Sequence, residues 1–132
     1  MPKNIGLGIE APKESCNDNN CPFHGRLKVR GRQFTGVVKS AKIHKTATVE
    51  WTRIVQIPKY ERYEKKRSTL KAHNPKCINA VEGDLVRIIG CRPLSKTKNF
   101  VIIEKIGREK LFKEKMEAEE EEEQEGKEEA EE

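Results

Sequence analysis

The chain has 132 residues, enough for one small domain with tails, and it is 34% hydrophobic and 37% charged. Residues 117–132 hold eleven Glu and one Lys, which leaves residues 1–116 with 26 Lys and Arg against 11 Asp and Glu, a net +15. So basic a body predicts a polyanionic partner, with nucleic acid as the first candidate, and the absence of an apolar run near ~20 residues excludes a membrane span.

The N-terminus, Met1–Asn4, lacks the apolar core of a secretion signal, so we expect a cytosolic protein with reduced cysteines. Residues 1–32 are rich in Asn, Pro, Gly and Cys and show no long period, which predicts an irregular arm with tight turns. Near its end Arg26, Lys28, Arg30 and Arg32 alternate with smaller residues. In an extended segment these cations would share one face and could follow a phosphate backbone.

Two strands open the predicted barrel, Gln33–Ile43 and Thr46–Ile57. The second has the clearest alternation of apolar and polar residues in the chain. Arg53-Ile54 breaks this alternation, which predicts a bulge or a change of the exposed face. The short link His44-Lys45 predicts a hairpin between the two strands.

A basic connection follows over Pro58–Lys76, in which Lys65–Leu70 is a candidate third strand. The turn residues of Ala72–Gly83 predict a loop. The β-branched runs Asp84–Ile89 and Asn99–Ile106 predict two further strands, which Arg92–Lys98 connects.

Five short strands in residues 33–106 predict an all-β fold, because closure into a small OB-type barrel hides the strand edges. An SH3-like barrel is the alternative. Residues 107–132 form a third region, with helical composition over Gly107–Met116 and a low-complexity acidic tail over Glu117–Glu132. The opposite charges suggest that the tail covers the basic body before RNA arrives.

The segment Arg92–Lys98 is the most informative local feature. Pro93 fixes its own φ and biases Arg92 toward an extended conformation, so the guanidinium lies on a stiff segment. Ser95 and Thr97 add hydroxyl donors for a phosphate or a ribose 2′-hydroxyl. This combination favours RNA contact, although a plain turn at a strand end explains part of it.

The cysteines allow two interpretations. Cys16, Cys21 and His24 have a spacing that could supply three zinc ligands, with His73 or Cys77 as the fourth. The second Cys-x-x-Cys pair of a zinc ribbon is missing, so the cysteines also fit reduced side chains packed in a core, as at Cys91. The predicted function requires no cofactor or metal, and zinc remains the alternative.

The sequence provides no catalytic signature. The three histidines His24, His44 and His73 fall in the arm, a turn and a loop. No phosphate-binding glycine loop, dinucleotide fingerprint or His-Glu-x-x-His motif occurs. We therefore expect a protein that is not an enzyme.

The run from Thr35 to Ile106 resembles the universal small-subunit ribosomal protein family S-seventeen, above all in Gly83–Lys98. The other matching pieces are Thr35–Val38, Lys45-Thr46, Tyr60, Lys65–Ser68 and His73. The arm with Cys21–Gly25 resembles the archaeal and eukaryotic branch, and the shortness of the arm together with His24 resembles the archaeal type. The long acidic tail departs from the family pattern.

The resemblance implies an OB-fold protein of cytoplasmic ribosomes that binds the 5′ region of small-subunit ribosomal RNA early in assembly. It implies other small-subunit proteins as neighbours, without a membrane partner or a homo-oligomer. It also implies RNA contacts by Lys45, Thr46, Lys65, Lys66, Arg67, His73, Arg92, Ser95, Lys96, Thr97 and Lys98. Arg30 and Arg32 are added from their charge and position.

Two other functions remain open. A free-standing OB module would bind single strands by stacking bases on aromatic side chains, for which the candidates are Phe34, Trp51, Tyr60, Tyr63 and Phe100. A zinc-dependent catalyst or redox protein would depend on the cysteines and would contain the metal.

Overall fold

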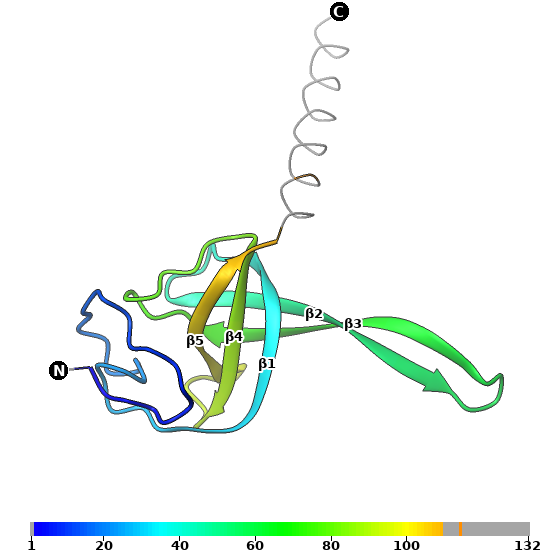
Figure 1. Cartoon of the computed structure of the whole chain (residues 1–132), viewed down its shortest axis with the longest axis horizontal. Helices are drawn as coiled ribbons and strands as arrows, with labels where there is room; N and C mark the ends of the chain where they lie inside the picture. The colour runs from blue at the N-terminus through cyan, green and yellow to red at the C-terminus, as the bar shows by residue number, and fades with distance from the viewer. Residues whose placement is uncertain (1, 110–113, 115–132) are drawn as a thin grey trace, which may run out of the picture.

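Five strands surround the core in the computed structural model, which describes residues 2–109 and Glu114 (Figure 1). They are β1 (Val29–Ser40), β2 (Thr46–Ile57), β3 (Arg62–His73), β4 (Asp84–Cys91) and β5 (Lys98–Arg108). The strands pair in the order β1-β2-β3-β5-β4, and β4 pairs again with β1, so the sheet closes into a barrel. Only the β3–β5 pairing is parallel. This five-stranded OB-type barrel confirms the predicted all-β fold.

The strand boundaries differ from the predicted ones mainly where pairing depends on remote residues. The prediction of Thr46–Ile57 is confirmed at both ends, because its alternation is a local signal. β1 instead begins at Val29, where it pairs with Cys91 of β4, and it ends at Ser40 before the turn to β2. β4 and β5 each extend beyond the predicted runs for the same reason.

The candidate third strand Lys65–Leu70 is confirmed, but it is longer than predicted, because Arg62–His73 is one strand within the predicted connection. β3 pairs with β2 at every position from Thr46 to Ile57, whereas β1 and β5 reach this pair only near its inner end. Residues 52–67 therefore form a two-stranded projection, named here the ribbon, that extends from the barrel (Figure 1). The polar sequence of the ribbon hides the full length of this strand, because neither face of the ribbon covers a core.

The bulge predicted at Arg53-Ile54 is absent from the β2–β3 pairing. Arg53 pairs with Lys66 and Ile54 with Lys65 without a shift of register. Ile54 is 70% exposed because it lies on the ribbon, beyond the last contact of β2 with β1. The break in alternation thus marks the point where the strand pair leaves the barrel, as the alternative of a changed face predicts.

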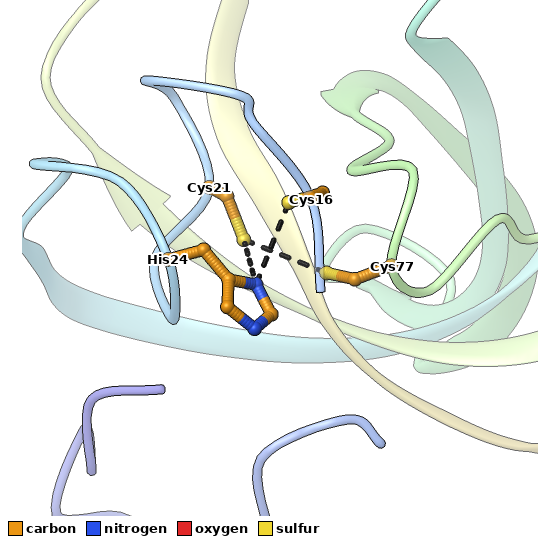
Figure 2. Close-up of side chains that lie close together, drawn as sticks. All are labelled: Cys16, Cys21, His24 and Cys77. Carbon is orange, nitrogen blue, oxygen red and sulfur yellow. Dashed lines mark hydrogen bonds between the residues drawn. The ribbon is translucent and has the colours of Figure 1, made fainter. Parts of the chain in front are cut away.

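The N-terminal arm, residues 2–28, is irregular, as predicted, and packs on the barrel. Phe23 and Leu27 are buried against Ile89, Val101 and Ile103 of β4 and β5. Backbone hydrogen bonds fold the arm on itself, including one from the Lys3 amide to the Phe23 carbonyl at 2.7 Å. The arm also carries three side chains that meet Cys77 of the loop between β3 and β4 (Figure 2).

The predicted C-terminal helix over 107–116 and the acidic tail over 117–132 fall almost entirely outside the described residues. Gly107 and Arg108 are described, and they complete β5. Within residues 2–109 and Glu114, no helix is long and apolar enough to cross a membrane.

Gly36 allows β1 and β2 to approach closely. A Cβ at this position would lie 2.7 Å from Cγ1 of Val49 and 2.9 Å from the carbonyl oxygen of Glu50. We expect Gly36→Ala to lower the free energy of unfolding by roughly 1–2 kcal/mol, because the backbone oxygen cannot move aside easily. Urea denaturation would measure the change, with Gly107→Ala as the control because its Cβ would meet nothing within 4 Å. Equal midpoints for the two variants would contradict this packing argument.

Candidate nucleic-acid interface

The turn between β4 and β5 presents Arg92 and Lys96 to solvent on a stiff backbone. The Leu94 amide donates to the Lys98 carbonyl at 2.9 Å, and the Lys98 amide donates to the Ser95 hydroxyl oxygen at 3.1 Å. These two bonds close the turn from both sides. The turn therefore holds a guanidinium, an ammonium and hydroxyl groups in a fixed arrangement that suits contact with a sugar–phosphate backbone.

Arg30 and Arg32 lie beside this turn although they are about sixty positions away in sequence. Val29 pairs with Cys91 and Gln33 with Ile89, so residues 30–32 of β1 face only Gly90. Gly31 has a φ of +102°, which lies outside the range of an extended strand and which glycine adopts more easily than other residues. The resulting bulge leaves both arginines exposed at the end of β4 that delivers Arg92.

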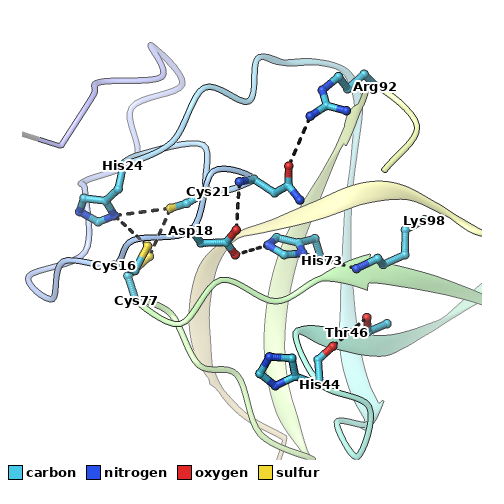
Figure 3. A network of polar contacts seen from close by, with 11 residues as sticks. Cys16, Asp18, Cys21, His24, His44, Thr46, His73, Cys77, Arg92 and Lys98 are labelled. Carbon is cyan, nitrogen blue, oxygen red and sulfur yellow. Dashed lines mark hydrogen bonds and ion pairs between the residues drawn. The ribbon is translucent and has the colours of Figure 1, made fainter. Parts of the chain in front are cut away.

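His73 occupies the centre of a polar network at this end of the barrel (Figure 3). Its Nε2 lies 2.6 Å from Oδ2 of Asp18, and its Nδ1 lies 3.5 Å from Nζ of Lys98. The Asn20 amide donates to Oδ1 of Asp18, and the Asn20 side-chain oxygen accepts from Nη2 of Arg92 at 3.3 Å. The network thus connects the N-terminal arm to two cations of the β4–β5 turn.

Burial and two nearby lysines favour the neutral form of His73. Burial lowers the pKa of His73, the Asp18 carboxylate opposes this effect, and Lys98 and Lys45 lower the pKa further, so the net shift is downward. A neutral imidazole can donate from Nε2 to Asp18 and accept from Lys98 at Nδ1, which agrees with both distances. The histidine therefore positions two charged neighbours.

Lys45 lies in the turn between β1 and β2, at the opposite end of β1 from Arg30 and Arg32. Lys45 has a φ of +54°, and its carbonyl accepts a hydrogen bond from the Asn74 amide at 2.9 Å. Thr46 is buried, and its hydroxyl donates to the His44 carbonyl at 3.4 Å. The backbone of this turn is held next to His73, since Thr46 and His73 are partners in the β2–β3 pairing.

The predicted RNA-contact residues divide into four groups. We name as the rim surface the groups gathered where β4 ends, which are Arg30, Arg32, Arg92, Ser95, Lys96, Thr97 and Lys98. Lys45 lies apart from them, in the β1–β2 turn next to His73. Lys65, Lys66 and Arg67 lie instead on the ribbon, where all three are exposed. Thr46 and His73 have partners inside the protein, so here they support the rim surface. Contact of any of these residues with RNA remains a prediction.

Asp18 and Asn20 are the parts of this site that the sequence alone did not reveal. Asp18 is buried and lies within a turn-forming Asp-Asn-Asn run of the arm. That run predicts a turn, but nothing in it indicates His73, which is 55 positions away. Only the packing of the arm on the barrel makes this pair visible.

The structure selects Cys77 as the fourth member of the predicted zinc candidates. Single ligand atoms of Cys16, Cys21, His24 and Cys77 all lie within 4.8 Å of one another. His73, the other candidate, directs its imidazole to Asp18 and Lys98 instead. Among residues 2–109 and Glu114, these four are the only group of at least three His, Cys, Asp or Glu side chains that lie close enough together to hold a metal ion.

Comparisons with known proteins agree with the predicted family. The family model described as Ribosomal protein S17 matches residues 36–104. The small ribosomal subunit protein uS17 of Methanocaldococcus jannaschii is 55% identical over 106 residues, which cover 80% of this chain and 91% of that protein. The proteins of the same name from Methanopyrus kandleri and Archaeoglobus fulgidus are 56% and 53% identical over 108 residues each, covering 82% and 81% of this chain and 92% and 96% of theirs. The chain therefore belongs to the S17 family of small-subunit ribosomal proteins.

Proposed function

We propose that this protein is a structural constituent of the small ribosomal subunit that binds its RNA through the rim surface and the ribbon. Its relatives carry the name of a small ribosomal subunit protein, and the 80–82% of this chain that they cover extends beyond the barrel. The function is structural, as in the family, and not catalytic. The partners are ribosomal RNA and neighbouring small-subunit proteins in cytoplasmic ribosomes.

The observation that carries this proposal is the convergence of cations on one end of the barrel. Arg30 and Arg32 on the one hand and the β4–β5 turn on the other come from two remote segments of the chain, and the pairing of Val29 with Cys91 brings them together. Asp18, the carboxylate of this network, is buried and accepts hydrogen bonds from inside the protein. The exposed face is therefore dominated by cations and hydroxyls, which suits phosphate neutralisation.

The arrangement of the aromatic side chains favours folded RNA over a free single strand. Trp51 stacks on Phe34 with ring centroids 4.8 Å apart, and Phe100 lies 5.9 Å from Phe34. All three pack against the barrel core, so they provide no open platform for bases. Tyr60 and Tyr63 are 64% and 73% exposed, but they lie at the tip of the ribbon, remote from the rim surface.

The protein would act as a single copy in the subunit, without a membrane partner, and would contact the 5′ region of the RNA.

Phosphate neutralisation predicts a steep dependence of RNA binding on salt. The logarithm of the association constant K should fall by roughly 0.7–0.9 per phosphate contact for each decade of salt. Filter binding of the full chain to folded small-subunit RNA, from low to moderate salt, would measure the slope. Footprinting on the same RNA would identify the protected region.

Competition with unstructured oligonucleotides provides the control for this experiment. A steep salt slope with preference for the folded RNA is expected. A flat salt response, or tighter binding of the unstructured competitor, would contradict phosphate neutralisation on folded RNA and favour a module for single strands.

A further inference from the structure

The cysteine–histidine cluster in the N-terminal arm takes no part in the RNA-binding proposal. Sγ of Cys16 and Sγ of Cys21 each lie 3.4 Å from Nδ1 of His24, and Sγ of Cys21 lies 3.5 Å from Sγ of Cys77 (Figure 2). Cys77 belongs to the loop between β3 and β4, 56 positions after Cys21. Two remote segments thus direct four donor atoms at one point.

These distances are close to the edges of a zinc coordination tetrahedron. With Zn–S and Zn–N bonds of about 2.3 and 2.0–2.1 Å, a tetrahedral ion places sulfurs about 3.8 Å apart and sulfur and nitrogen about 3.6 Å apart. The observed contacts of 3.4–3.5 Å are slightly shorter, and every pair of donor atoms lies within 4.8 Å. Small side-chain movements would therefore admit the ion.

The donor set and its surroundings also fit zinc. Three thiolates and an imidazole suit Zn²⁺ and not the oxygen-seeking Mg²⁺ or Ca²⁺. Cys21 and Cys77 are buried and Cys16 and His24 are partly buried, so the four donor groups are largely shielded from solvent.

A disulfide between Cys21 and Cys77 explains the cluster less well. It would use only two of the four groups and leave unexplained why Nδ1 of His24 lies 3.4 Å from the sulfurs of both Cys16 and Cys21. Reduced cysteines packed as hydrophobic side chains would not require an imidazole among them. Four protein ligands leave no open position on the ion, which argues for a structural site and against a catalytic one.

We propose that Cys16, Cys21, His24 and Cys77 bind one structural Zn²⁺ ion, which fastens the N-terminal arm to the loop between β3 and β4. The segment between the first two ligands contains Asp18 and Asn20. Because these residues contact His73 and Arg92, the ion also fixes the position of the arm beneath the rim surface (Figure 3).

Metal analysis of the purified full chain, kept reduced, tests the proposal. We expect about one zinc per chain for the unchanged protein, and about one for Cys91→Ser, the matched control. Cys91 is the fourth cysteine, and its thiol donates to the Arg92 carbonyl outside the cluster. Cys77→Ser and Cys16→Ser should each fall to a small fraction of one zinc per chain.

Cobalt substitution keeps the test decisive if a serine variant does not fold. The unchanged chain should bind one Co²⁺ and show the visible absorption of a tetrahedral thiolate site, and zinc should displace it. His24→Cys should retain the metal and strengthen the sulfur-to-cobalt absorption, because Cys₄ sites also bind zinc. Removal of the metal should increase the proteolytic cleavage of residues 2–28.

Several results would overturn the site. These are less than ~0.1 zinc per reduced chain, an octahedral cobalt spectrum, or full metal content in Cys77→Ser. Loss of zinc from Cys91→Ser would overturn the ligand assignment. A metal-free chain with a Cys21–Cys77 disulfide would establish the redox alternative. Because no RNA is present, the outcome is independent of the proposed ribosomal function.

Discussion

Replacing Arg92 and Lys96 together by Ala is expected to weaken binding to folded small-subunit RNA roughly twentyfold near 0.15 M salt. Two lost phosphate contacts should lower the slope of log K against log salt by roughly 1.4–1.8, and affinities should converge near 1 M salt. Both side chains are exposed. The variant keeps the two hydrogen bonds that close the turn, from the Leu94 amide to the Lys98 carbonyl and from the Lys98 amide to the Ser95 hydroxyl oxygen. Filter binding across a salt series would measure both quantities.

A charge-matched variant separates a local contact from a general effect of net charge. Lys39→Ala with Arg87→Ala also removes two cations, which pair with Glu50 and Glu104 on strands outside the rim surface. We expect this control to lose only a few-fold in affinity and to keep most of the slope. Equal losses in the two variants would mean that the rim surface has no specific contact. A shifted thermal unfolding midpoint in the Arg92 and Lys96 variant would instead make the turn structural.

Asp84→Ala is expected to lower the free energy of unfolding by about 2–3 kcal/mol. The carboxylate is fully buried and accepts from the Val81 amide at 2.9 Å, and it pairs with Lys105 at 3.1 Å and Arg108 at 3.4 Å. These contacts hold the end of β5 against the start of β4. The loss is moderated because Lys105 and Arg108 are partly exposed and can return to water.

Two further variants show which contact matters at Asp84. Asp84→Asn keeps an oxygen for the Val81 amide but removes the charge, so we expect an intermediate loss in urea denaturation. Glu104→Ala removes the exposed pair with Arg87, for which we expect less than ~1 kcal/mol. If Asp84→Ala and Glu104→Ala were equally stable, burial of the ion pairs would not be the source of the effect.

The zinc proposal changes how the N-terminal arm is understood. The spacing of the cysteines in the sequence is compatible both with a zinc site and with reduced cysteines packed in a core. The reason is that one segment supplies only three candidate ligands, Cys16, Cys21 and His24. The fold places Cys77 beside Cys16, Cys21 and His24. His73 instead forms a hydrogen bond with Asp18. The choice between two candidate ligands was therefore made by packing, since both lie within five positions of each other in sequence.

Local patterns were sufficient for much of this protein. The alternation in Thr46–Ile57 predicted that strand with its correct limits, and Gly83–Lys98 carried the family signature. These signals are readable because side-chain period and turn chemistry involve neighbours in the chain. The composition likewise separated a basic body from an acidic tail without any structure.

Only the tertiary structure decided the ribbon, the rim surface and the cysteine–histidine cluster. The strand Arg62–His73 has few apolar residues because its outer half covers no core, so pairing with β2 and not burial defines it. Arg30 lies beside the turn of Arg92, and His73 contacts Asp18, because barrel closure sets the register between remote strands. Register is a property of the whole sheet, which no single segment of the sequence encodes.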